Sequence, residues 1–318
     1  MTDATDGAAS TSPPQTVMGR LHESLEHLPC LSGEPRDVEA LEGGLTNFNF
    51  KVSTPERVAV VRLSSSDGDL LAIDRAAEHA NSVRAAASGA APAVLDHLPD
   101  HQALVVAWVE GRTLTPEDLR DEHMLGRVAA ACRMLHAGDR FVGDFDMFEV
   151  QRRYLSIVQE RGFRLPARYL ELLPEVDRIA RALAARQEAT VPCNNDLLAA
   201  NVIDDGDRLW LIDYEYAGNN DACFELGNIW SESNLSLEHL EWLVDSYYGA
   251  HLRHKVARAR LLGLMSNYGW TLWASIQAAV SPIDFDFWTW GMEKYERAVE
   301  EFDGPHLDRL LDEARRTD

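Results

Sequence analysis

The stretch VPCNNDLLAANVIDDGDRLWLIDYEYAG, residues 191–218, decides the fold of this chain. It places Asp196, Asn201 and Asp213 beside apolar runs. A carboxylate near a core costs free energy, so a fold keeps one there only with a partner or a task. An isolated Asp-x-x-x-x-Asn is most often a pair of turn residues. Here the apolar strand RLWLI follows at the right distance and ends in Asp213, which favours a catalytic site.

Phosphoryl transfer to a hydroxyl needs the residue types that this stretch contains. A carboxylate orients the acceptor and takes its proton, while oxygen ligands hold magnesium against the phosphates of the nucleotide. Magnesium usually takes one or two protein oxygens, and phosphates and waters fill its other positions. The order of Asp196, Asn201 and Asp213 matches a kinase catalytic loop followed by a metal-binding Asp.

Composition restricts the possible partners. The 318 residues are 46% hydrophobic, which suffices for a substantial core in one or two domains. A formal net charge of -22 repels nucleic-acid phosphates and anionic lipid, so we expect no nucleic-acid partner. The same charge is compatible with a cationic small molecule as partner.

The cysteines and the apolar runs indicate the compartment. The four cysteines lie far apart without a Cys-x-x-Cys pair, which argues against a zinc site and a dense disulfide framework. No apolar run approaches the roughly 18–20 residues that cross a bilayer, so we expect no membrane insertion. The polar, proline-containing start predicts a disordered leader over 1–18 and lacks the pattern of a secretory signal. A cytoplasmic enzyme is the expectation.

The two halves of the chain differ in pattern and predict an α+β fold. Residues 19–109 contain three strand-like runs, one helical stretch and two further strands, which predicts a small N-terminal lobe with an antiparallel sheet. Residues 110–318 are mostly helical and form the larger lobe. Its first helix is expected to begin with Thr115 as N-cap and Pro116 at the first helical position. Further helices are predicted at roughly 147–162 and 168–188, and from about 222 onward.

The chain resembles the choline/ethanolamine kinases and, more broadly, the aminoglycoside phosphotransferase-like kinases. The resemblance runs from about Leu41 to Tyr295 and is strongest in NNDLLAANVI…LWLIDYEYAGNNDACFELGN. It implies a two-lobed protein-kinase-like fold with ATP and Mg²⁺ between the lobes. It also implies that Asp196 is the catalytic base and that Asn201 and Asp213 hold magnesium.

One position departs from the pattern of this family. The family usually has His two residues before the catalytic Asp, whereas this chain has Asn194. That His mainly organises the backbone through hydrogen bonds, and Asn also donates and accepts them. A catalytically weak, pseudokinase-like binding protein therefore stays an alternative.

The stretch EGGLTN, residues 42–47, is a candidate for the loop that covers the nucleotide. Gly43 and Gly44 allow close backbone approach, and Thr46 and Asn47 are expected to contact phosphates. Two glycines alone are more often a plain hairpin turn, so the prediction depends on the surrounding pattern.

The third strand, VAVVRL, is expected to supply the cation that reaches the phosphates. Arg62 fills this position, where choline kinases resemble this chain in using Arg. An arginine keeps its charge and makes forked contacts with phosphate oxygens. Glu78 on the following helix is its expected ion-pair partner. Two solvated charges are the commoner explanation of such a pair taken alone.

The acceptor is indicated by aromatic residues, since six of the eight tryptophans follow Tyr214. At helical spacing most of them are expected in the core. The resemblance to choline kinases, which hold a trimethylammonium group among rings beside a carboxylate, implies that Glu232 is the carboxylate. The implied rings are Tyr216, Trp270, Trp273, Phe285 and Trp290.

The chemistry of the cation then favours choline or a related amino alcohol. A quaternary ammonium has no N–H and is held by ring faces, each contributing roughly 0.5–1 kcal/mol when exposed and about 2 kcal/mol when desolvated. A primary ammonium instead needs oxygen acceptors, because an unmatched N–H in a dry pocket is costly. Ethanolamine, an amino sugar or an aminoglycoside are the alternative acceptors.

Overall fold

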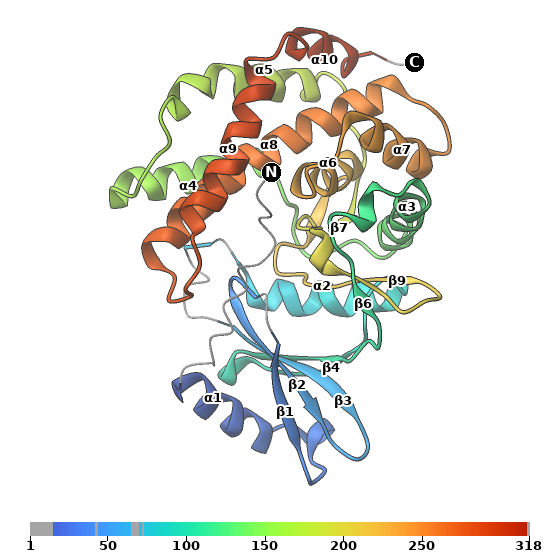
Figure 1. The fold of residues 1–318 in the computed structure, drawn as a ribbon, viewed down its shortest axis with the longest axis vertical. Helices are drawn as coiled ribbons and strands as arrows, with labels where there is room; N and C mark the ends of the chain where they lie inside the picture. The colour runs from blue at the N-terminus through green and yellow to red at the C-terminus, as the bar shows by residue number, and fades with distance from the viewer. Residues whose placement is uncertain (1–14, 42–43, 65–69, 72, 317–318) are drawn as a thin grey trace.

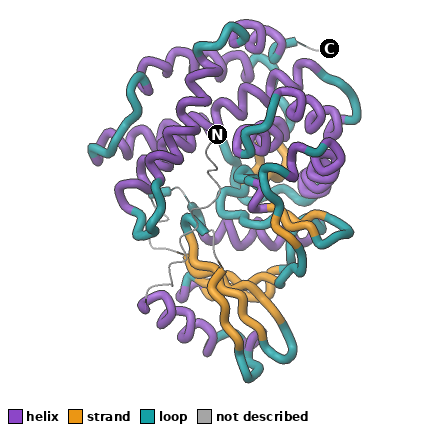
Figure 2. Tube along the Cα trace, in the orientation of Figure 1, coloured by secondary structure: helices purple, strands orange, loops and turns teal. Residues whose placement is uncertain are grey.

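The computed structural model describes residues 15–41, 44–64, 70–71 and 73–316. The chain forms two lobes, with strands concentrated in one and helices in the other (Figures 1 and 2). This is the α+β, two-lobed arrangement that the sequence predicts. The helix α2 lies between the sheet and the helical lobe (Figure 1).

The described part of the N-terminal lobe contains a five-stranded antiparallel sheet with the order β1-β2-β3-β5-β4. In β3, Val61 and Leu63 are buried in the core of this lobe, together with Ala59. Because side chains alternate across a strand, Val60 and Arg62 lie on the other face, where they line a cavity. The strands are β1 Asp37–Leu41, β2 Asn47–Ser53, β3 Val58–Ser64, β4 Val94–Leu98 and β5 Ala103–Ala107.

The helix α1, Gln15–Glu26, packs on this sheet and corrects the predicted leader. Val17, Leu21 and Leu25 are buried in the same core as the sheet. Their four-residue spacing forms an apolar stripe on one helix face, so the segment gains enough burial to fold. Residues 15–18 of the predicted 1–18 leader are therefore helical, and residues 1–14 lie outside the described residues.

The helix α2, Arg75–Ser88, follows the first three strands and precedes the last two, as predicted. The Asp74 carboxylate caps its start by accepting hydrogen bonds from the backbone amides of Ala76 and Ala77. Gly89 ends it with a left-handed φ of 85°, a conformation that glycine adopts without steric cost.

Two small sheets and most of the helices form the C-terminal lobe (Figure 1). One sheet has the antiparallel order β6-β8-β9, and the other is the antiparallel pair β7–β10. The stretch 191–218 begins in β7, contains β8 and β9, and ends at the start of β10. The strands are β6 Arg112–Thr113, β7 Thr190–Cys193, β8 Val202–Asp204, β9 Leu209–Leu211 and β10 Gly218–Asp221. The α-helices are α3 Glu122–His136, α4 Met147–Arg161, α5 Leu173–Ala184, α6 Ala222–Glu232, α7 Leu237–Tyr248, α8 Arg253–Val280, α9 Phe287–Phe302 and α10 Leu307–Glu313. The 3₁₀ turns are Pro29–Leu31, Pro99–His101, Asp118–Arg120, Tyr169–Leu172 and Ala199–Asn201.

The first helix of this lobe starts later than predicted. Asp121, not Thr115, is the N-cap of α3, and its carboxylate accepts a hydrogen bond from the amide of Met124. Thr115 donates through both its amide and its hydroxyl to Asp118, which closes a separate 3₁₀ turn. The local hydrogen bonds of Thr115 therefore compete with helix formation at this point.

The helix α8 passes through the middle of the lobe and packs against α4, α6 and α9. It is 28 residues long and buried over most of its length. Glycines let α6 come close to it: a Cβ on Gly227 would lie 2.1 Å from the carbonyl oxygen of Ala259. Within the described residues, no helix combines the length and the apolar character needed to span a bilayer.

Candidate active site

The loop between β7 and β8 carries Asp196 and Asn201, and β9 leads directly to Asp213. The side-chain amide of Asn201 donates to the carbonyl of Asp196 at 2.7 Å, and the carbonyl of Asn201 accepts from the amide of Ile212 at 2.9 Å. These bonds hold the loop against the strand that precedes Asp213. The three residues that the sequence predicts as a catalytic group are thus brought together.

Asn194 connects the two halves of this arrangement. Its side-chain amide donates to the carbonyls of Ile212 and Asp213, at 3.1 and 2.7 Å, and its side-chain oxygen accepts from the amide of Asp196 at 3.0 Å. The residue is completely buried. Asn194 therefore performs the backbone-organising task that the sequence assigns to it, with three hydrogen bonds.

Glu225, on α6, supports the catalytic loop from beneath. Its two carboxylate oxygens accept the backbone amides of Asn194 and Asn195 at 2.9 and 2.7 Å. Hydrogen bonds of this kind hold Asn195 in a left-handed conformation with φ 69°, which asparagine tolerates. The sequence gives no hint of this pairing, because the partners lie 30 and 31 residues apart.

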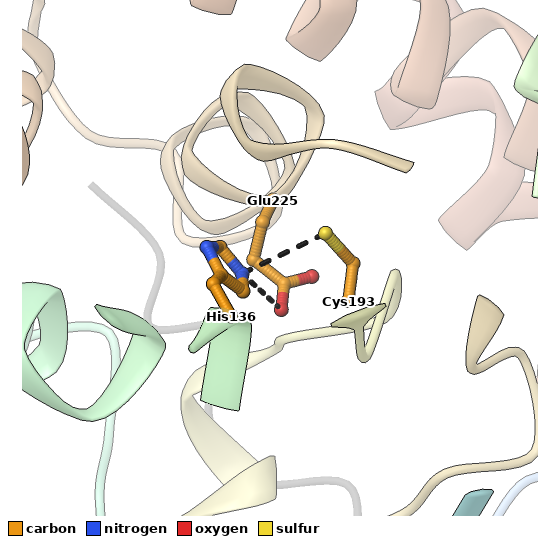
Figure 3. Close-up of side chains that lie close together, drawn as sticks. All are labelled: His136, Cys193 and Glu225. Carbon is orange, nitrogen blue, oxygen red and sulfur yellow. Dashed lines mark hydrogen bonds and ion pairs between the residues drawn. The ribbon is translucent and has the colours of Figure 1, made fainter. Parts of the chain in front are cut away.

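His136 and Cys193 complete the surroundings of Glu225 (Figure 3). The Nε2 atom of His136 lies 3.5 Å from Glu225 Oε1 and 3.6 Å from Cys193 Sγ, while its Nδ1 contacts the Tyr247 hydroxyl at 2.7 Å. Burial raises the pKa of the Cys193 thiol well above its usual range, so the sulfur stays protonated. Since both Glu225 oxygens bind loop amides, this cluster is a support for the loop.

Arg62 joins the nucleotide lobe to Asp213. Its Nη1 lies 2.8 Å from Glu78 Oε1, the ion pair that the sequence predicts, and also 2.8 Å from Asp213 Oδ1. Although burial alone would lower it, the neighbouring carboxylates of Asp213 and Glu78 raise the pKa of Arg62. Burial opposes the charge on Glu78 as well, yet Arg62 and Arg75 hold the pKa of its carboxyl below the usual value.

Thr46 and Asn47 are engaged with Glu215 of the larger lobe. The Thr46 hydroxyl and the Asn47 side-chain amide each donate to the Glu215 carboxylate at 2.8 Å, and Arg75 lies 3.3 Å from it. Burial, reinforced by Asp213, raises the pKa of Glu215 to about 7. These contacts tie the predicted loop to the C-terminal lobe. They do not support the expectation that the two side chains contact phosphates.

The predictions for Gly43 and Gly44 have different outcomes. Gly43 lies outside the described residues. Gly44 makes the close backbone approach that was expected, since a Cβ there would lie 2.4 Å from the carbonyl oxygen of Asn47. Leu45 anchors the loop further, because its carbonyl accepts a hydrogen bond from Gln277 of α8 at 3.1 Å.

Two cavities meet at this group of residues. The larger, about 340 Å³, lies between the sheet of the N-terminal lobe and the strands near Asp213, and Val60 and Leu104 face Ile203 and Ile212 across it. Such a flat apolar slot between lobes suits a nucleotide base. Arg62, Asn201 and Asp213 line the same cavity at its polar end. We call it the nucleotide cavity.

The smaller cavity, about 100 Å³, lies on the other side of Asn201 and Asp213 and contains Asp196 in its wall. We call it the acceptor cavity. Four predicted rings and the predicted carboxylate also line it: Tyr216, Trp270, Trp273, Trp290 and Glu232. Gly44, Ala200, Asn201 and Asp213 border both cavities.

The rings of the acceptor cavity are held by one another. The Trp273 indole donates to the Tyr216 hydroxyl at 2.8 Å, and the Tyr216 ring meets Trp270 edge-on at 4.8 Å between centroids. Trp273 and Trp290 are 5.6 Å apart. Edge-to-face packing of this kind fixes ring orientation and stabilises by about 0.5–1.5 kcal/mol per pair.

Phe285 is not part of this wall among the described residues. It is 38% exposed and lines a separate surface cavity with Phe287 and Trp288. Phe285 precedes Asp286, the N-cap of α9, so it lies on the loop and its ring packs on Phe287 at 4.9 Å. The Phe285 ring also meets Trp290 edge-on at 6.4 Å between centroids, so it lies next to a ring of the acceptor cavity while it borders the neighbouring surface cavity.

Lys294, which sequence reasoning did not single out, accompanies Glu232. Its ammonium group contacts Glu232 Oε2 and lies 4.1 Å from the centroid of the Trp290 ring. Both charged side chains are at most 3% exposed. Trp290 and Lys294 are neighbours on one face of α9, but their contact with α6 is long-range, and no local pattern reveals it.

The charges around Asp196 alter its acidity. Burial raises the pKa of this carboxyl well above its usual range, and Glu232, Asp213 and Glu215 raise it further, while Lys294 lowers it. A buried carboxyl with a strongly raised pKa in a cavity is a candidate for proton transfer. Asp196 therefore lies in the wall of the acceptor cavity, which shares Asn201 and Asp213 with the nucleotide cavity.

The donor set at the junction fits a magnesium ion. Asp213 Oδ1 is buried and, within the part of the chain that the structure describes, forms no aligned hydrogen bond, although Arg62 lies near it. Asn201, whose side-chain nitrogen is bound to the carbonyl of Asp196 and whose side chain also carries an oxygen, lines both cavities. An amide and a carboxylate oxygen beside a phosphate site are the ligands that magnesium prefers.

Comparisons with known proteins agree with this geometry. The choline/ethanolamine kinase family model matches residues 38–244. Ethanolamine kinase 2 of Mus musculus is 25% identical over 312 residues, covering 88% of this chain and 80% of the relative. A solved choline/ethanolamine kinase family protein from Mesorhizobium loti has a TM-score of 0.82 and 30% identity over 94% of this chain and 99% of that chain.

A second solved structure shows the same fold at lower identity. The choline kinase LicA from Streptococcus pneumoniae has a TM-score of 0.77 and 23% identity over 89% of this chain and 99% of that chain. These matches confirm the protein-kinase-like fold that the sequence predicts. The chain belongs to the choline/ethanolamine kinase family, whose members are phosphotransferases with an alcohol group as acceptor.

Proposed function

We propose that this protein transfers the γ-phosphate of ATP, in the presence of Mg²⁺, to the hydroxyl of a small cationic amino alcohol, choline or a relative such as ethanolamine. One observation carries the proposal. The nucleotide cavity and the acceptor cavity meet at Asn201 and Asp213, and Asp196 lies on the acceptor side of this junction. An alcohol in the smaller cavity would thus lie between a base and the end of a nucleotide.

In the proposed reaction, Asp196 orients the alcohol and accepts its proton as the oxygen attacks the phosphorus. Arg62, held by Glu78, binds the phosphate oxygens from the nucleotide side. Asn201 and Asp213 would hold magnesium, which neutralises charge on the phosphates when bound.

The lining of the acceptor cavity supports a cationic acceptor of small size. Aromatic faces and the Glu232 carboxylate attract an ammonium group. A volume of about 100 Å³ suits an amino alcohol of a few heavy atoms better than a multi-ring aminoglycoside. The buried hydrogen bonds of Asn194 support an ordered catalytic loop, so they favour an active kinase over a silent binding protein.

The experiment that tests the function measures ADP release from MgATP with choline, ethanolamine, an amino sugar and no acceptor. We expect release that depends on an amino alcohol and that falls by about 10²–10⁴ in Asp196→Asn, the usual contribution of a positioned base. Asp207→Asn, in the exposed β8–β9 turn of the same hairpin, is the matched control and should keep full turnover. Turnover in Asp196→Asn equal to the unsubstituted protein would overturn the role of Asp196.

A further inference from the structure

Lys294 gives the acceptor cavity a cation of its own. The side chain extends from α9, is 2% exposed, and its ammonium group contacts Glu232 Oε2 and lies 4.1 Å above the Trp290 ring. Lys294 does not appear among the described residues that line the cavity, whereas Glu232 and Trp290 do. The ammonium therefore binds the wall from behind. It engages the same two groups, a carboxylate and a ring, that would attract a cationic substrate.

This contact changes what Glu232 offers to a ligand. The opposite charge of Lys294 compensates the carboxylate in a buried setting, where the attraction between the two is strong. Glu232 Oε1 is buried and has no hydrogen-bond partner within the described ranges. Glu232 thus brings to the lining of the cavity a carboxylate whose charge is balanced by Lys294 and whose second oxygen has no partner among the described residues.

The two kinds of acceptor headgroup respond differently to such a wall. A quaternary ammonium relies on uncompensated charge and free ring faces, because it has no N–H to donate. One face of Trp290 is already covered by Lys294. A primary or secondary ammonium can donate to Glu232 Oε1, and this bond removes the cost of a buried oxygen without a partner.

We propose that Lys294 is a specificity-determining residue, which shifts the acceptor cavity from quaternary ammonium groups toward ammonium groups that carry N–H. This inference rests on the proposed function, because it takes the cavity beside Asp196 as the acceptor site. It departs from the preference for choline that the aromatic residues suggest from sequence alone. Glu232 acts through its free oxygen, and Lys294 acts through Glu232.

The test uses headgroup probes that need no turnover. Methylammonium and tetramethylammonium are titrated into the full chain at pH 8, and binding is followed by the fluorescence of the tryptophans in the cavity wall. We expect methylammonium to bind at least about tenfold more tightly, since it alone satisfies Glu232 Oε1. Equal binding, or tighter binding of tetramethylammonium, would overturn the proposal.

Lys294→Met then tests the residue itself. Removing the ammonium leaves Glu232 as a buried unpaired charge, which any cation in the cavity would neutralise. The affinity for tetramethylammonium should increase most. The ratio of the methylammonium affinity to the tetramethylammonium affinity should therefore fall by at least about fivefold. Arg260→Met is the matched control: Arg260 forms a buried ion pair with Glu301 of α9, at 2.8 and 2.9 Å, outside the acceptor cavity. An equal change of the ratio in both variants would contradict a specific role of Lys294.

Lys294→Arg covers the case in which Lys294→Met does not fold. A guanidinium keeps the charge and can engage both Glu232 oxygens in a fork. Methylammonium should then lose its acceptor and bind more weakly, while tetramethylammonium changes little. An unchanged ratio in this variant would count against the proposal.

The two proposals fail separately. If the unsubstituted protein turns over no amino alcohol, the kinase function is contradicted, whatever the ratio of methylammonium to tetramethylammonium affinity. A ratio that favours tetramethylammonium in an enzyme that phosphorylates choline would contradict the role of Lys294 and leave the kinase function intact.

Discussion

At the scale of single residues, Asn194 shows how a departure from a family pattern is accommodated. The side chain makes three hydrogen bonds that join the segment of Asp196 to the segment of Asp213. An asparagine has two donors and an acceptor oxygen, so it can bind both carbonyls and one amide at once. The residue that raised doubt about activity therefore supports the geometry that activity requires.

Asn194→Ala should lower both stability and turnover. The carbonyls of Ile212 and Asp213 would lose their partner, and an unsatisfied buried group costs about 1–3 kcal/mol of unfolding free energy. Urea denaturation and ADP release measure the two effects. Asn194→His is the control, because an imidazole keeps a donor and an acceptor. An alanine variant as stable as the unsubstituted protein would show that these bonds contribute nothing.

Asp196 should give the reaction an acid limb at unusually high pH. Burial, then Glu232, raises the pKa of this carboxyl, and a base works only when ionised. The pH dependence of kcat/KM for MgATP reports ionisations of the free enzyme. We therefore expect kcat/KM to keep rising at pH values well above the usual pKa range of an aspartate. In the folded state this carboxyl binds its proton more tightly than when unfolded. Its contribution to stability is thus full below the unfolded pKa and lost as pH rises through the folded one.

Glu232→Gln tests the origin of this shift. Without the charge of Glu232, and with Lys294 unopposed, the pKa of Asp196 should fall, so the acid limb of kcat/KM should move to lower pH. A full pH profile of both proteins measures the displacement. A limb that stays in place would show that the charge of Glu232 does not contribute to the raised pKa of Asp196.

The limits of sequence reasoning are visible at this scale. Asp196, Asn201, Asp213 and Arg62 follow from motifs whose spacing is local, and the structure brings them together. Glu225 binds the amides of Asn194 and Asn195 in the catalytic loop, and Lys294 binds Glu232 on another helix. The sequence neighbours of Glu225 and Lys294 carry no pattern that indicates these contacts. Phe285 shows the converse limit: the motif places it beside Trp290, but it does not determine that the ring borders the neighbouring cavity.

At the scale of elements, the contact between α6 and α8 positions both sides of the site. The helix α6 carries Glu225, which holds the catalytic loop, and Glu232, which lines the acceptor cavity. Gly227 and Gly263 allow the two backbones to approach, since a Cβ on Gly263 would lie 2.6 Å from the carbonyl oxygen of Gly227. Shifting α6 would therefore displace the support of Asp196 and the acceptor wall together.

Gly227→Ala should disturb this contact. Its Cβ would overlap the backbone of α8 at Ala259, and overpacking of this kind typically costs about 1–3 kcal/mol. Gly126→Ala in α3 is the matched control, because the nearest atom to its Cβ is Ser246 Oγ at 4.0 Å. That variant should gain about 0.5–1 kcal/mol, since alanine favours a helix over glycine. Thermal unfolding measures the stability of both variants. Equal melting temperatures for Gly227→Ala and Gly126→Ala would contradict the close approach of α6 to α8.

The order of the elements was predictable where the periodicity was clear. The three strands, the helix α2 and the last two strands follow the predicted sequence, because their apolar residues alternate or repeat at regular intervals. The starts of α1 and α3 were not predicted. Residues 15–18 fold because α1 packs on the sheet, and Thr115 turns away from a helix because Asp118 binds it.

At the scale of the whole molecule, a network of charged groups joins the lobes. Glu215 of the larger lobe accepts Thr46 and Asn47, and Arg75 at the start of α2 contacts Glu215 and Glu78. Its members lie up to 169 residues apart in sequence. Such distant pairs explain why the lobes could be predicted separately while their contact could not.

The net charge of -22 should steer the two substrates in opposite directions. An acidic surface attracts a cationic amino alcohol and repels MgATP, and salt screens both effects over a Debye length of about 10 Å at 0.1 M. kcat/KM for the amino alcohol should fall as NaCl is added, while kcat/KM for MgATP should rise or stay level. Initial rates at several salt concentrations measure this. Parallel changes for both substrates would exclude steering by the surface charge.

The wall shared by the two cavities has a consequence for the path of the phosphoryl group. Gly44, Ala200, Asn201 and Asp213 line both cavities, so a nucleotide phosphate and an acceptor hydroxyl would approach each other directly beside these residues. The attacking oxygen and the leaving oxygen would then lie on opposite sides of the same phosphorus. With no protein carrier between them, we expect a single displacement, so a chiral γ-phosphorus would invert its configuration.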